Sequence, residues 1–306
     1  MQSDEYTNQE FFLDVGDGHQ LYVQDWGIKD AKRPIIFLHG GPGTGLKEAY
    51  KTTFEPTLQR VIFFDQRGTG KSLPYGSLKN NTTHDLVEDI EKLAKHLKLP
   101  KFIITGGSWG SCLALAYAIK YPDLVEALVL RGIFTGRKSE IDWLEKGGYR
   151  NFFPDVWQGF VDDTPKAHTK DPAAYHVPRI LGDDESAVAT SAYALGKVEG
   201  ALLSLDDRYT PSGQEEYDPT FVKIESHYMA NKCFMPDSYI LDNAGKINAP
   251  VWLIQGRYDM VCPPITAYEL DQRLPDSHLI WTVAGHSNDR GNYDVNRTIL
   301  LQMAGE

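Results

Sequence analysis

A serine stands at the centre of the pattern that most directly indicates chemistry. Residues 106–110 read GGSWG, which fits the motif G-x-S-x-G with Ser108 in the middle. The glycines of this motif allow a strained turn from a strand into a helix, which exposes the serine hydroxyl as a nucleophile. The pattern alone would arise by chance in about one such sequence in ten. Here an apolar run ends at Thr105 and a stretch of small residues follows Trp109, so the context predicts Ser108 as a nucleophile.

A nucleophilic serine needs a general base, and the base needs a group that orients it. Asp259 follows the apolar run 251–255, and His286 follows the run 279–283. Either residue alone would more often be an ordinary polar group in a loop. Because both come at the ends of successive strands, we expect their side chains to meet Ser108. The sequence predicts His286 as the base and Asp259 as the residue that orients it.

A glycine-rich loop offers backbone amides for the oxyanion of such a reaction. Residues 39–43 read HGGPG and follow the apolar run 34–38. We expect the oxyanion hole from the amides of Gly41 and Trp109. His39 is interpreted as a structural hydrogen-bonding residue rather than a second base. Residues 65–72, DQRGTGKS, lack the spacing of a phosphate loop, and their glycines are interpreted as serving a turn.

The elements that must position these residues follow from short apolar runs, each too short for a helix. The predicted strands are 10–15, 20–25, 34–38, 60–64, 101–105, 127–130, 251–255 and 279–283. The first two flank Asp17-Gly18, a turn dipeptide, which predicts an antiparallel hairpin. Helical stripes at 83–97 and 109–118 alternate with later strands, which predicts a mostly parallel central sheet with helices on both faces. Together with the order serine, aspartate, histidine, this predicts the α/β-hydrolase fold.

The strand pattern breaks in the middle of the chain. Residues 134–241 show helix-like segments, scattered prolines and acidic loops, without a convincing core strand. We therefore expect a helical cap at 134–241, inserted between two parts of one core, 1–133 and 242–306.

Two glutamates of the predicted cap lie where their helices should be apolar. Glu199 has Leu195 and Leu202 at helical spacing, and Glu225 has Val222 and Met229 on its own face. A glutamate on a helix is usually solvated, and this reading stays open from the sequence. A buried carboxylate needs a cationic partner, and the ammonium group of a substrate could be that partner.

Composition excludes several classes of partner. The chain has 306 residues, 42% of them hydrophobic, and a formal net charge of -11 without any run of five basic residues. The charge opposes binding of nucleic acid. The first residues are polar, and no apolar run approaches about 18 residues, so we expect no membrane contact and a soluble, cytoplasmic protein. Three cysteines without CxxC spacing predict free thiols and no zinc site.

The motifs HGGPG, DQRGTGKS, GGSWGS, GRYDMVCPP and AGHS occur in this order. Together they resemble those of the proline iminopeptidases, also called prolyl aminopeptidases, which are serine peptidases. The stretches NTTHDLVEDIEKL at 81–93 and IESHY at 224–228 extend the resemblance into the cap. In that family two cap glutamates hold the free N-terminal amine of the peptide. The resemblance maps them onto Glu199 and Glu225.

The resemblance implies hydrolysis of an N-terminal residue, preferably proline, through an acyl-enzyme, without metal or cofactor. The implied partner is a small peptide or aminoacyl substrate with a free N-terminus, and the oligomeric state stays unknown. One departure concerns Leu195 and Val198, which stand where the family usually has tryptophan, so strictness for proline is in question. Two alternatives remain: an esterase or amidase with the same residues and no need for an amine, and a noncatalytic binding protein of the same fold.

Overall fold

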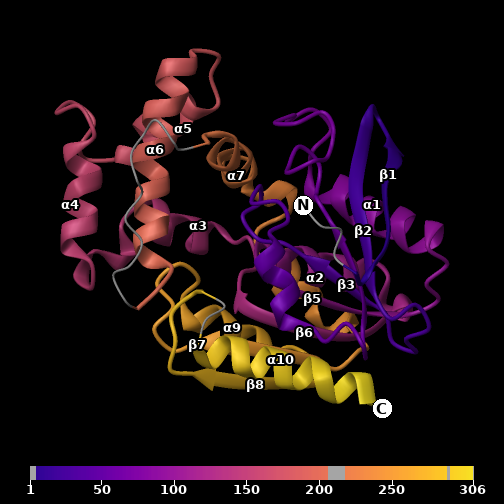
Figure 1. Cartoon of the computed structure of the whole chain (residues 1–306). Coiled ribbons are helices and arrows are strands. Elements are labelled where there is room, and N and C mark those ends of the chain that lie inside the picture. Colours follow the sequence, from indigo (N-terminus) through magenta and orange to yellow (C-terminus); the bar gives the residue numbers. More distant parts are fainter. Residues whose placement is uncertain (1–4, 206–217, 288–289, 306) are drawn as a thin grey trace.

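The chain is built around a single sheet (Figure 1). The structure is a computed structural model that describes residues 5–205, 218–287 and 290–305. The described residues form eight strands in the order β1-β2-β4-β3-β5-β6-β7-β8. β1 pairs antiparallel with β2, and β2 with β4, whereas every later pair is parallel. The strands are β1 Thr7–Gly16, β2 His19–Gly27, β3 Ile35–Leu38, β4 Arg60–Phe64, β5 Phe102–Ser108, β6 Val125–Ile133, β7 Val251–Gly256 and β8 Ser277–Thr282.

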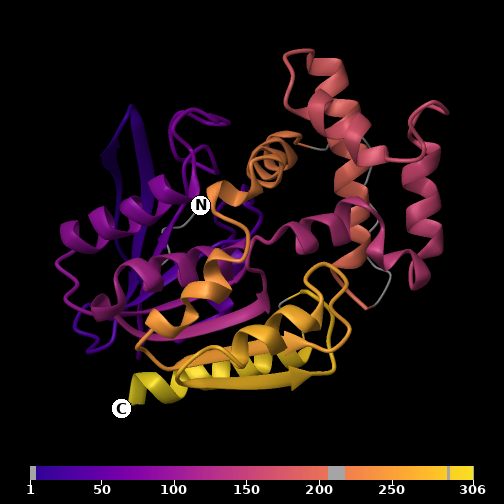
Figure 2. The same cartoon turned by 180° about the vertical axis from the view of Figure 1, so that it is seen from behind.

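Helices cover both faces of this sheet, and each face has its own apolar core. One core includes residues of α1 Thr83–His96, α2 Trp109–Lys120, α8 Tyr239–Asn243 and α9 Pro264–Asp271. The other includes Ile299, Leu300 and Met303 of α10 Arg290–Gly305, which pack against β6 and β7. Figures 1 and 2 show α10 running along the outer side of β8 and β7. The mostly parallel sheet with helices on both faces is confirmed.

The eight predicted strands all occur, with shifted ends. β4 has the predicted bounds, while β5 continues to Ser108 and β6 extends in both directions. The end predicted for the last strand is wrong. β8 stops at Thr282, and Val283 is 78% exposed, because the chain turns away from the sheet there to begin the loop that carries His286. An exposed valine after a strand has no sequence signal that distinguishes it from a strand residue.

The helix α1 illustrates how local sequence sets an element. Thr82 accepts a hydrogen bond from the amide of Asp85, and the Asp85 carboxylate accepts one from the amide of Thr82, which together form a capping box. Its apolar stripe, with Leu86, Ile90 and Leu93, is buried in the apolar core that covers one face of the sheet. The helix ends at His96, one residue earlier than predicted.

Between β6 and β7 the described residues contain helices and no strand. These helices are α3 Lys138–Glu145, α4 Pro154–Asp162, α5 Pro172–Ile180, α6 Glu185–Leu202 and α7 Thr220–Ala230, followed by α8. In Figures 1 and 2, α4, α5 and α6 stand together apart from the sheet, and α7 lies between them and the rest of the chain. α8 crosses position 241 and contacts α2. The division at 134 and 241 into core and cap stays a prediction.

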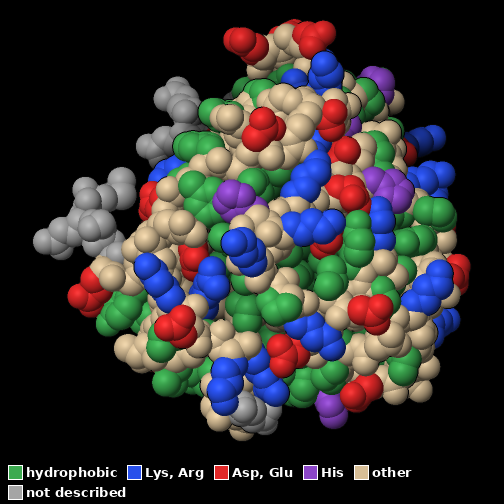
Figure 3. Space-filling view, turned by 90° about the vertical axis from the view of Figure 1, so that its right-hand side faces the viewer, with side chains coloured by type: hydrophobic (Ala, Val, Ile, Leu, Met, Phe, Trp, Pro, Cys, Tyr) green, Lys and Arg blue, Asp and Glu red, His purple; other side chains and the backbone are tan. Residues whose placement is uncertain are grey.

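The visible surface mixes charges of both signs. Figure 3 shows Lys and Arg side chains interspersed with Asp and Glu on the face that it presents, without a continuous basic stripe there. Among the described residues, no helix combines the length and apolar character needed to span a bilayer.

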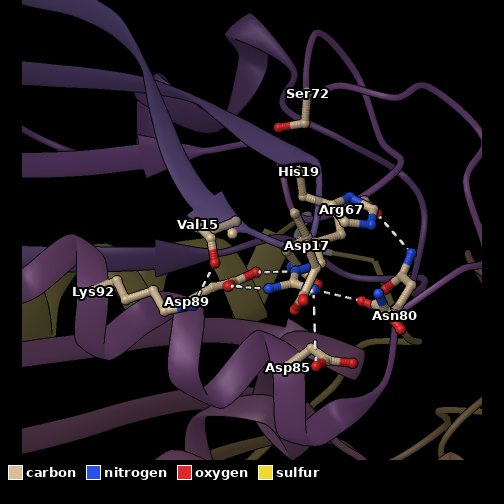
Figure 4. Close-up of polar contacts among 12 residues, drawn as sticks. Val15, Asp17, His19, Arg67, Ser72, Asn80, Asp85, Asp89 and Lys92 are labelled. Atoms are coloured by element: carbon tan, nitrogen blue, oxygen red, sulfur yellow. Dashed lines mark hydrogen bonds and ion pairs between the residues drawn. The ribbon is translucent and has the colours of Figure 1, made fainter.

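A buried ion pair anchors the turn at residues 65–72, beside the sheet (Figure 4). The guanidinium of Arg67, 2% exposed as a residue, donates from Nε and Nη2 to the two carboxylate oxygens of Asp89 at 2.6 and 2.7 Å. Its Nη1 donates to the carbonyl of Asn80 at 2.6 Å. The turn is further held by the Asp65 carboxylate, which accepts from the amides of Leu46 and Lys71. These contacts confirm that the loop serves a structural turn.

Removing Asp89 should leave the buried guanidinium of Arg67 with only the Asn80 carbonyl at 2.6 Å and the carboxylates of Asp17 and Asp85 at 3.8 Å. We expect Asp89→Leu to lower the free energy of unfolding by about 3–5 kcal/mol, measured by urea denaturation. The double variant Arg67→Met/Asp89→Leu should regain part of that loss. Lys138→Met, which breaks an exposed pair with Asp142, is the control and should cost at most about 1 kcal/mol. Equal losses in Asp89→Leu and Lys138→Met would contradict the assignment.

Candidate active site

Ser108 occupies a strained turn at the junction of β5 and α2. Its backbone has φ 57° and ψ −126°, a conformation that costs a non-glycine residue about 1–3 kcal/mol. The turn requires glycines on either side, because a Cβ at Gly106 or Gly110 would lie 2.7 or 2.3 Å from the carbonyl oxygen of Leu38 on β3. The predicted strand-to-helix turn is therefore present, with the serine at its apex.

Asp259 and His286 are brought together across two neighbouring strand ends. His286 Nδ1 lies 2.8 Å from Asp259 Oδ2, and both side chains are buried. The other carboxylate oxygen, Oδ1, accepts hydrogen bonds from the amides of Val261 and Cys262 at 3.0 and 2.7 Å. These bonds hold the carboxylate so that it fixes Nδ1 as the protonated nitrogen and leaves Nε2 free to act as a base.

Two supporting residues escaped the sequence analysis. The Gln255 side chain accepts from the amide of Ile133 at 2.8 Å and donates to Asp259 Oδ2 at 3.2 Å. Gly132 has φ +50°, and a Cβ there would lie 2.9 Å from Cε1 of His286. The sequence contains one possible signal for Gln255, because it is a polar residue at the end of the apolar run 251–255. Gly132 had none, because its neighbour in space is 154 residues away in the sequence, from 132 to 286.

Ser108 and His286 line one cavity, which also reaches Gly41 and Glu199. Among the hydrogen bonds of the described residues, none joins the Ser108 hydroxyl to His286, and the serine instead lies beside the thiol of Cys262. Serine–histidine hydrogen bonds in such sites often tighten only when substrate binds. The three residues predicted as nucleophile, base and orienting carboxylate thus share one site. The hydrogen bond between the Ser108 hydroxyl and His286 is not formed in this structure.

The loop that carries His286 is tied to the end of α6. The Leu203 carbonyl accepts from the amides of His286 and Ser287 at 3.0 and 2.8 Å. From the other side, Asn292 Nδ2 on α10 donates to the carbonyls of Gly285 and Ser287 at 3.0 and 2.9 Å. The histidine loop and α6 therefore have a defined position relative to each other.

Gly41 and Trp109 both lie close to the nucleophile. Trp109 is the first residue of α2, where a helix leaves its amides without an acceptor inside the helix. The glycine loop approaches so closely that a Cβ at Gly40 would be 3.5 Å from Cβ of Ser108. Gly41 and Ser108 line the same cavity. The arrangement can present two amides toward one side of the serine.

His39 is a structural residue, as predicted. Its Nε2 accepts from the amide of Gln66 at 3.1 Å, and its Nδ1 donates to the Gly40 carbonyl at 3.0 Å. Burial lowers the pKa of His39, which keeps the imidazole neutral. The Gln66 side chain also accepts from the Trp109 indole at 2.9 Å, so the turn at 65–72 supports the residue next to the nucleophile.

Glu199 of α6 and Glu225 of α7 meet beside Ser108. Both line the same cavity as the serine, and the two carboxyl groups lie close enough for each to influence the pKa of the other. Burial raises the pKa of Glu225 well above its usual value, and the neighbouring Glu199 raises it further. Burial also raises the pKa of Glu199. The two carboxyl groups that the sequence singled out separately therefore lie together, and their surroundings disfavour ionisation of both at once.

α7 is fixed to the core by residues near Glu225. Tyr228 donates from its hydroxyl to Asn81 Oδ1 at 2.7 Å, and its ring packs edge-on against Trp109 with 4.7 Å between ring centroids. His227 Nε2 lies 3.0 Å from the Asn81 carbonyl oxygen. Because Tyr228 lies three positions after Glu225 on one helix face, these contacts also set the position of that carboxyl.

The rest of the cavity wall is mainly apolar. Leu195 contributes to it directly, whereas Val198 is 2% exposed within α6. Among the described residues, no group of three or more His, Cys, Asp or Glu side chains has an arrangement that could hold a metal ion.

Comparison with known proteins gives consistent matches. The family described as "alpha/beta hydrolase fold" matches residues 33–288. A proline iminopeptidase from Arabidopsis thaliana is 44% identical over 90% of this chain and 74% of the relative. A proline iminopeptidase from Neisseria gonorrhoeae is 40% identical over 90% of this chain and 89% of the relative.

Solved structures support the fold. A proline iminopeptidase from Mycobacterium smegmatis aligns with a TM-score of 0.66 at 19% identity, covering 97% of this chain and 98% of the other. An esterase from Exiguobacterium antarcticum aligns with a TM-score of 0.62, also at 19% identity, covering 97% and 100%. Because enzymes of both kinds align about equally, the backbone alone does not distinguish their chemistry.

A side chain at position 132 should displace the histidine. We expect Gly132→Ala to lower kcat/KM by about 10²-fold, because a catalytic group misplaced by about 1 Å loses activity on that scale. The measurement compares hydrolysis of an aminoacyl-naphthylamide with circular dichroism of the same samples. Gly159→Ala is the control, since a Cβ at Gly159 meets nothing within 4 Å. Full activity of Gly132→Ala would show that His286 does not need its present position.

Proposed function

Because the chain belongs to the α/β hydrolase family and, within it, to the proline iminopeptidase family, we propose that it is a serine aminopeptidase. It releases an N-terminal residue, preferably proline, from a peptide through an acyl-enzyme. The observation that carries this proposal is that the carboxyl groups of Glu199 and Glu225 lie together in the same cavity as Ser108. The hydrolysis of an ester does not require two adjacent carboxyl groups at that place.

In the proposed mechanism Ser108 attacks the carbonyl carbon of the first residue. His286 Nε2 takes the hydroxyl proton, while Asp259 holds the imidazole and stabilises its charged form. The negative oxygen of the tetrahedral intermediate accepts hydrogen bonds from the amides of Gly41 and Trp109. His286 then gives its proton to the leaving amine, and the acyl-enzyme forms. Water, activated by the same histidine, attacks the ester and releases the amino acid.

The glutamate pair recognises the free amine of the substrate in this proposal. Without a cation, two adjacent carboxyl groups that are largely removed from water can stay together only if one of them keeps its proton. A substrate ammonium displaces that proton to the solvent, so the pair becomes fully ionised and each carboxylate accepts hydrogen bonds from the amine. Holding the amine in this way places the carbonyl carbon of the first residue next to Ser108. A peptide binds productively only if no other residue precedes that amine.

Three further assignments belong to this proposal. Residues 134–241 form a cap that brings Glu199 and Glu225 over the nucleophile, while 1–133 and 242–306 form the core. The partner is a small peptide or aminoacyl compound with a free N-terminus. A cytoplasmic location is supported by Cys112, Cys233 and Cys262, which are buried free thiols, as is usual in a reducing compartment.

Loss of the nucleophile should abolish turnover without unfolding the chain. We expect Ser108→Ala to retain no more than the roughly 10³- to 10⁴-fold acceleration over water that binding and an oxyanion hole provide. A fluorophosphonate probe should label the wild-type protein at Ser108 and fail to label this variant, as read by mass spectrometry. Labelling at another serine, with activity retained, would refute the assignment.

Removing the substrate's charge should prevent cleavage. We expect prolyl-naphthylamide to be hydrolysed and its N-acetyl derivative to lose about 2–5 kcal/mol of transition-state binding, at least tenfold in kcat/KM. Glu199→Gln and Glu225→Gln should each weaken cleavage of the free-amine substrate. Both should leave labelling of Ser108 by a small neutral phosphonate largely intact.

The control for these variants is Glu185→Gln, which removes a carboxylate that is exposed at the start of α6. It should behave like the wild-type protein with both substrates. Equal kcat/KM for the free and acetylated substrates would contradict the aminopeptidase proposal and favour an esterase or amidase.

A further inference from the structure

A third carboxyl group, Glu145, faces the cavity that contains the glutamate pair. It is the last residue of α3 and lines this cavity together with Ser108, Glu199 and Glu225. Glu145 is also close enough to Glu225 to contribute to the raised pKa of that carboxyl. Neither the mechanism nor the recognition of the amine proposed above uses it.

Within the part of the chain that the structure describes, Glu145 makes no hydrogen bond or ion pair. Its neighbour in the cavity, Glu140, differs sharply: it accepts from the Thr135 amide and hydroxyl at 2.7 and 2.5 Å and from Arg137 Nε at 2.7 Å. Glu140 is therefore satisfied by the protein itself. Glu145 has the same chemistry and none of these partners.

The surroundings of Glu145 favour a positive or proton-donating group. Burial raises the pKa of Glu145 to about 7, and the charges of Asp142 and Asp171 act in the same direction. Lys138 and Lys146 offset this only in part, because both side chains are more than half exposed and pair with Asp142. An incoming donor would therefore stabilise the ionised carboxylate.

A second unused polar group lines the same cavity. Ser226 is 1% exposed, and its hydroxyl has no hydrogen-bond partner. It lies next to Glu225 in the sequence, on α7. A buried hydroxyl without a partner costs about 1–3 kcal/mol, so the cavity carries unsatisfied hydrogen-bonding capacity beyond the glutamate pair.

The position of the substrate directs its side chain toward this part of the cavity. In the proposed function the carbonyl lies at Ser108 and the amine at Glu199 and Glu225, which fixes the α-carbon between them. The side chain must then occupy the remaining space, whose walls are formed by apolar residues such as Ile141, Leu144 and Leu195 and by Glu145. In such a pocket a single carboxyl group has a large effect on which side chain is accepted.

We propose that Glu145 is a specificity residue that favours an N-terminal residue whose side chain carries a hydrogen-bond donor, an ammonium or a hydroxyl group. This inference rests on the proposed function, since it assumes that the amine and the carbonyl are held as described there. The chemistry common to both donors is a proton directed at the carboxyl oxygens. An ammonium requires the negative charge, whereas a hydroxyl requires only an acceptor.

The test uses two matched pairs of aminoacyl-naphthylamides. Lysine is compared with norleucine, which has the same four-carbon chain without the ammonium, and 4-hydroxyproline is compared with proline. The quantity measured is the ratio of kcat/KM within each pair, for the wild-type protein, Glu145→Gln and Glu145→Leu. Glu185→Gln, which removes an exposed carboxylate at the start of α6 outside this cavity, is the control.

We expect at least one ratio to fall about tenfold or more in Glu145→Leu. If the preferred donor is an ammonium, Glu145→Gln should lower the lysine ratio as strongly, because the amide has no charge. If it is a hydroxyl, Glu145→Gln should keep much of the 4-hydroxyproline ratio, because the amide oxygen still accepts. Glu185→Gln should leave both ratios unchanged.

Two results would overturn the inference. The first is that both ratios stay the same in Glu145→Gln and Glu145→Leu. The second is that all free-amine substrates weaken equally whatever their side chain, which would place Glu145 in the amine site. Labelling of Ser108 by a fluorophosphonate establishes that each variant is folded, and Glu145→Gln remains informative if Glu145→Leu is not. Cleavage of prolyl-naphthylamide by the wild-type protein separates failure of this inference from failure of the proposed function.

Discussion

The strained backbone at Ser108 is the constraint on which the rest of the site depends. A serine with positive φ persists only if the surrounding structure over-determines it. Gly106 and Gly110 allow the turn to lie directly against β3, within van der Waals reach of the Leu38 carbonyl. Trp109, which is fully buried, is held by its indole hydrogen bond to Gln66. The buried pair of Arg67 and Asp89 in turn fixes the loop to which Gln66 belongs.

A few specific hydrogen bonds also position α6 and α7, the helices that carry Glu199 and Glu225. α6 is connected to the histidine loop through the Leu203 carbonyl, and α7 is connected to the start of α1 through Asn81. Both connections involve residues within four positions of the glutamate on that helix. The position of each carboxyl relative to the β5–α2 turn is therefore defined. The packing of α6 and α7 offsets the free-energy cost of removing the two carboxyl groups from water.

The fold by itself leaves the chemistry open. An esterase and a proline iminopeptidase align with this chain at nearly equal TM-scores, because sheet order and the serine turn are common to many hydrolases. This cavity carries several carboxyl groups in a mainly apolar wall: Glu199 and Glu225 lie together, and Glu145 makes no hydrogen bond or ion pair with any described residue. The proposed specificity for an amine, and for a donor on the side chain, rests on these groups and not on the backbone.

The sequence by itself determined the strands, the turn at Ser108 and the order of the three residues proposed for catalysis. These depend on local signals: continuous apolar runs, glycines around a serine, and polar residues immediately after strands. Only the tertiary structure decided which distant residues meet. The approach of Gly132 to His286, the hydrogen bonds of Gln255 and the meeting of Glu199 with Glu225 in one cavity join segments far apart in the chain. Periodicity reports which face of one element is apolar, and it contains no information on which element packs against that face.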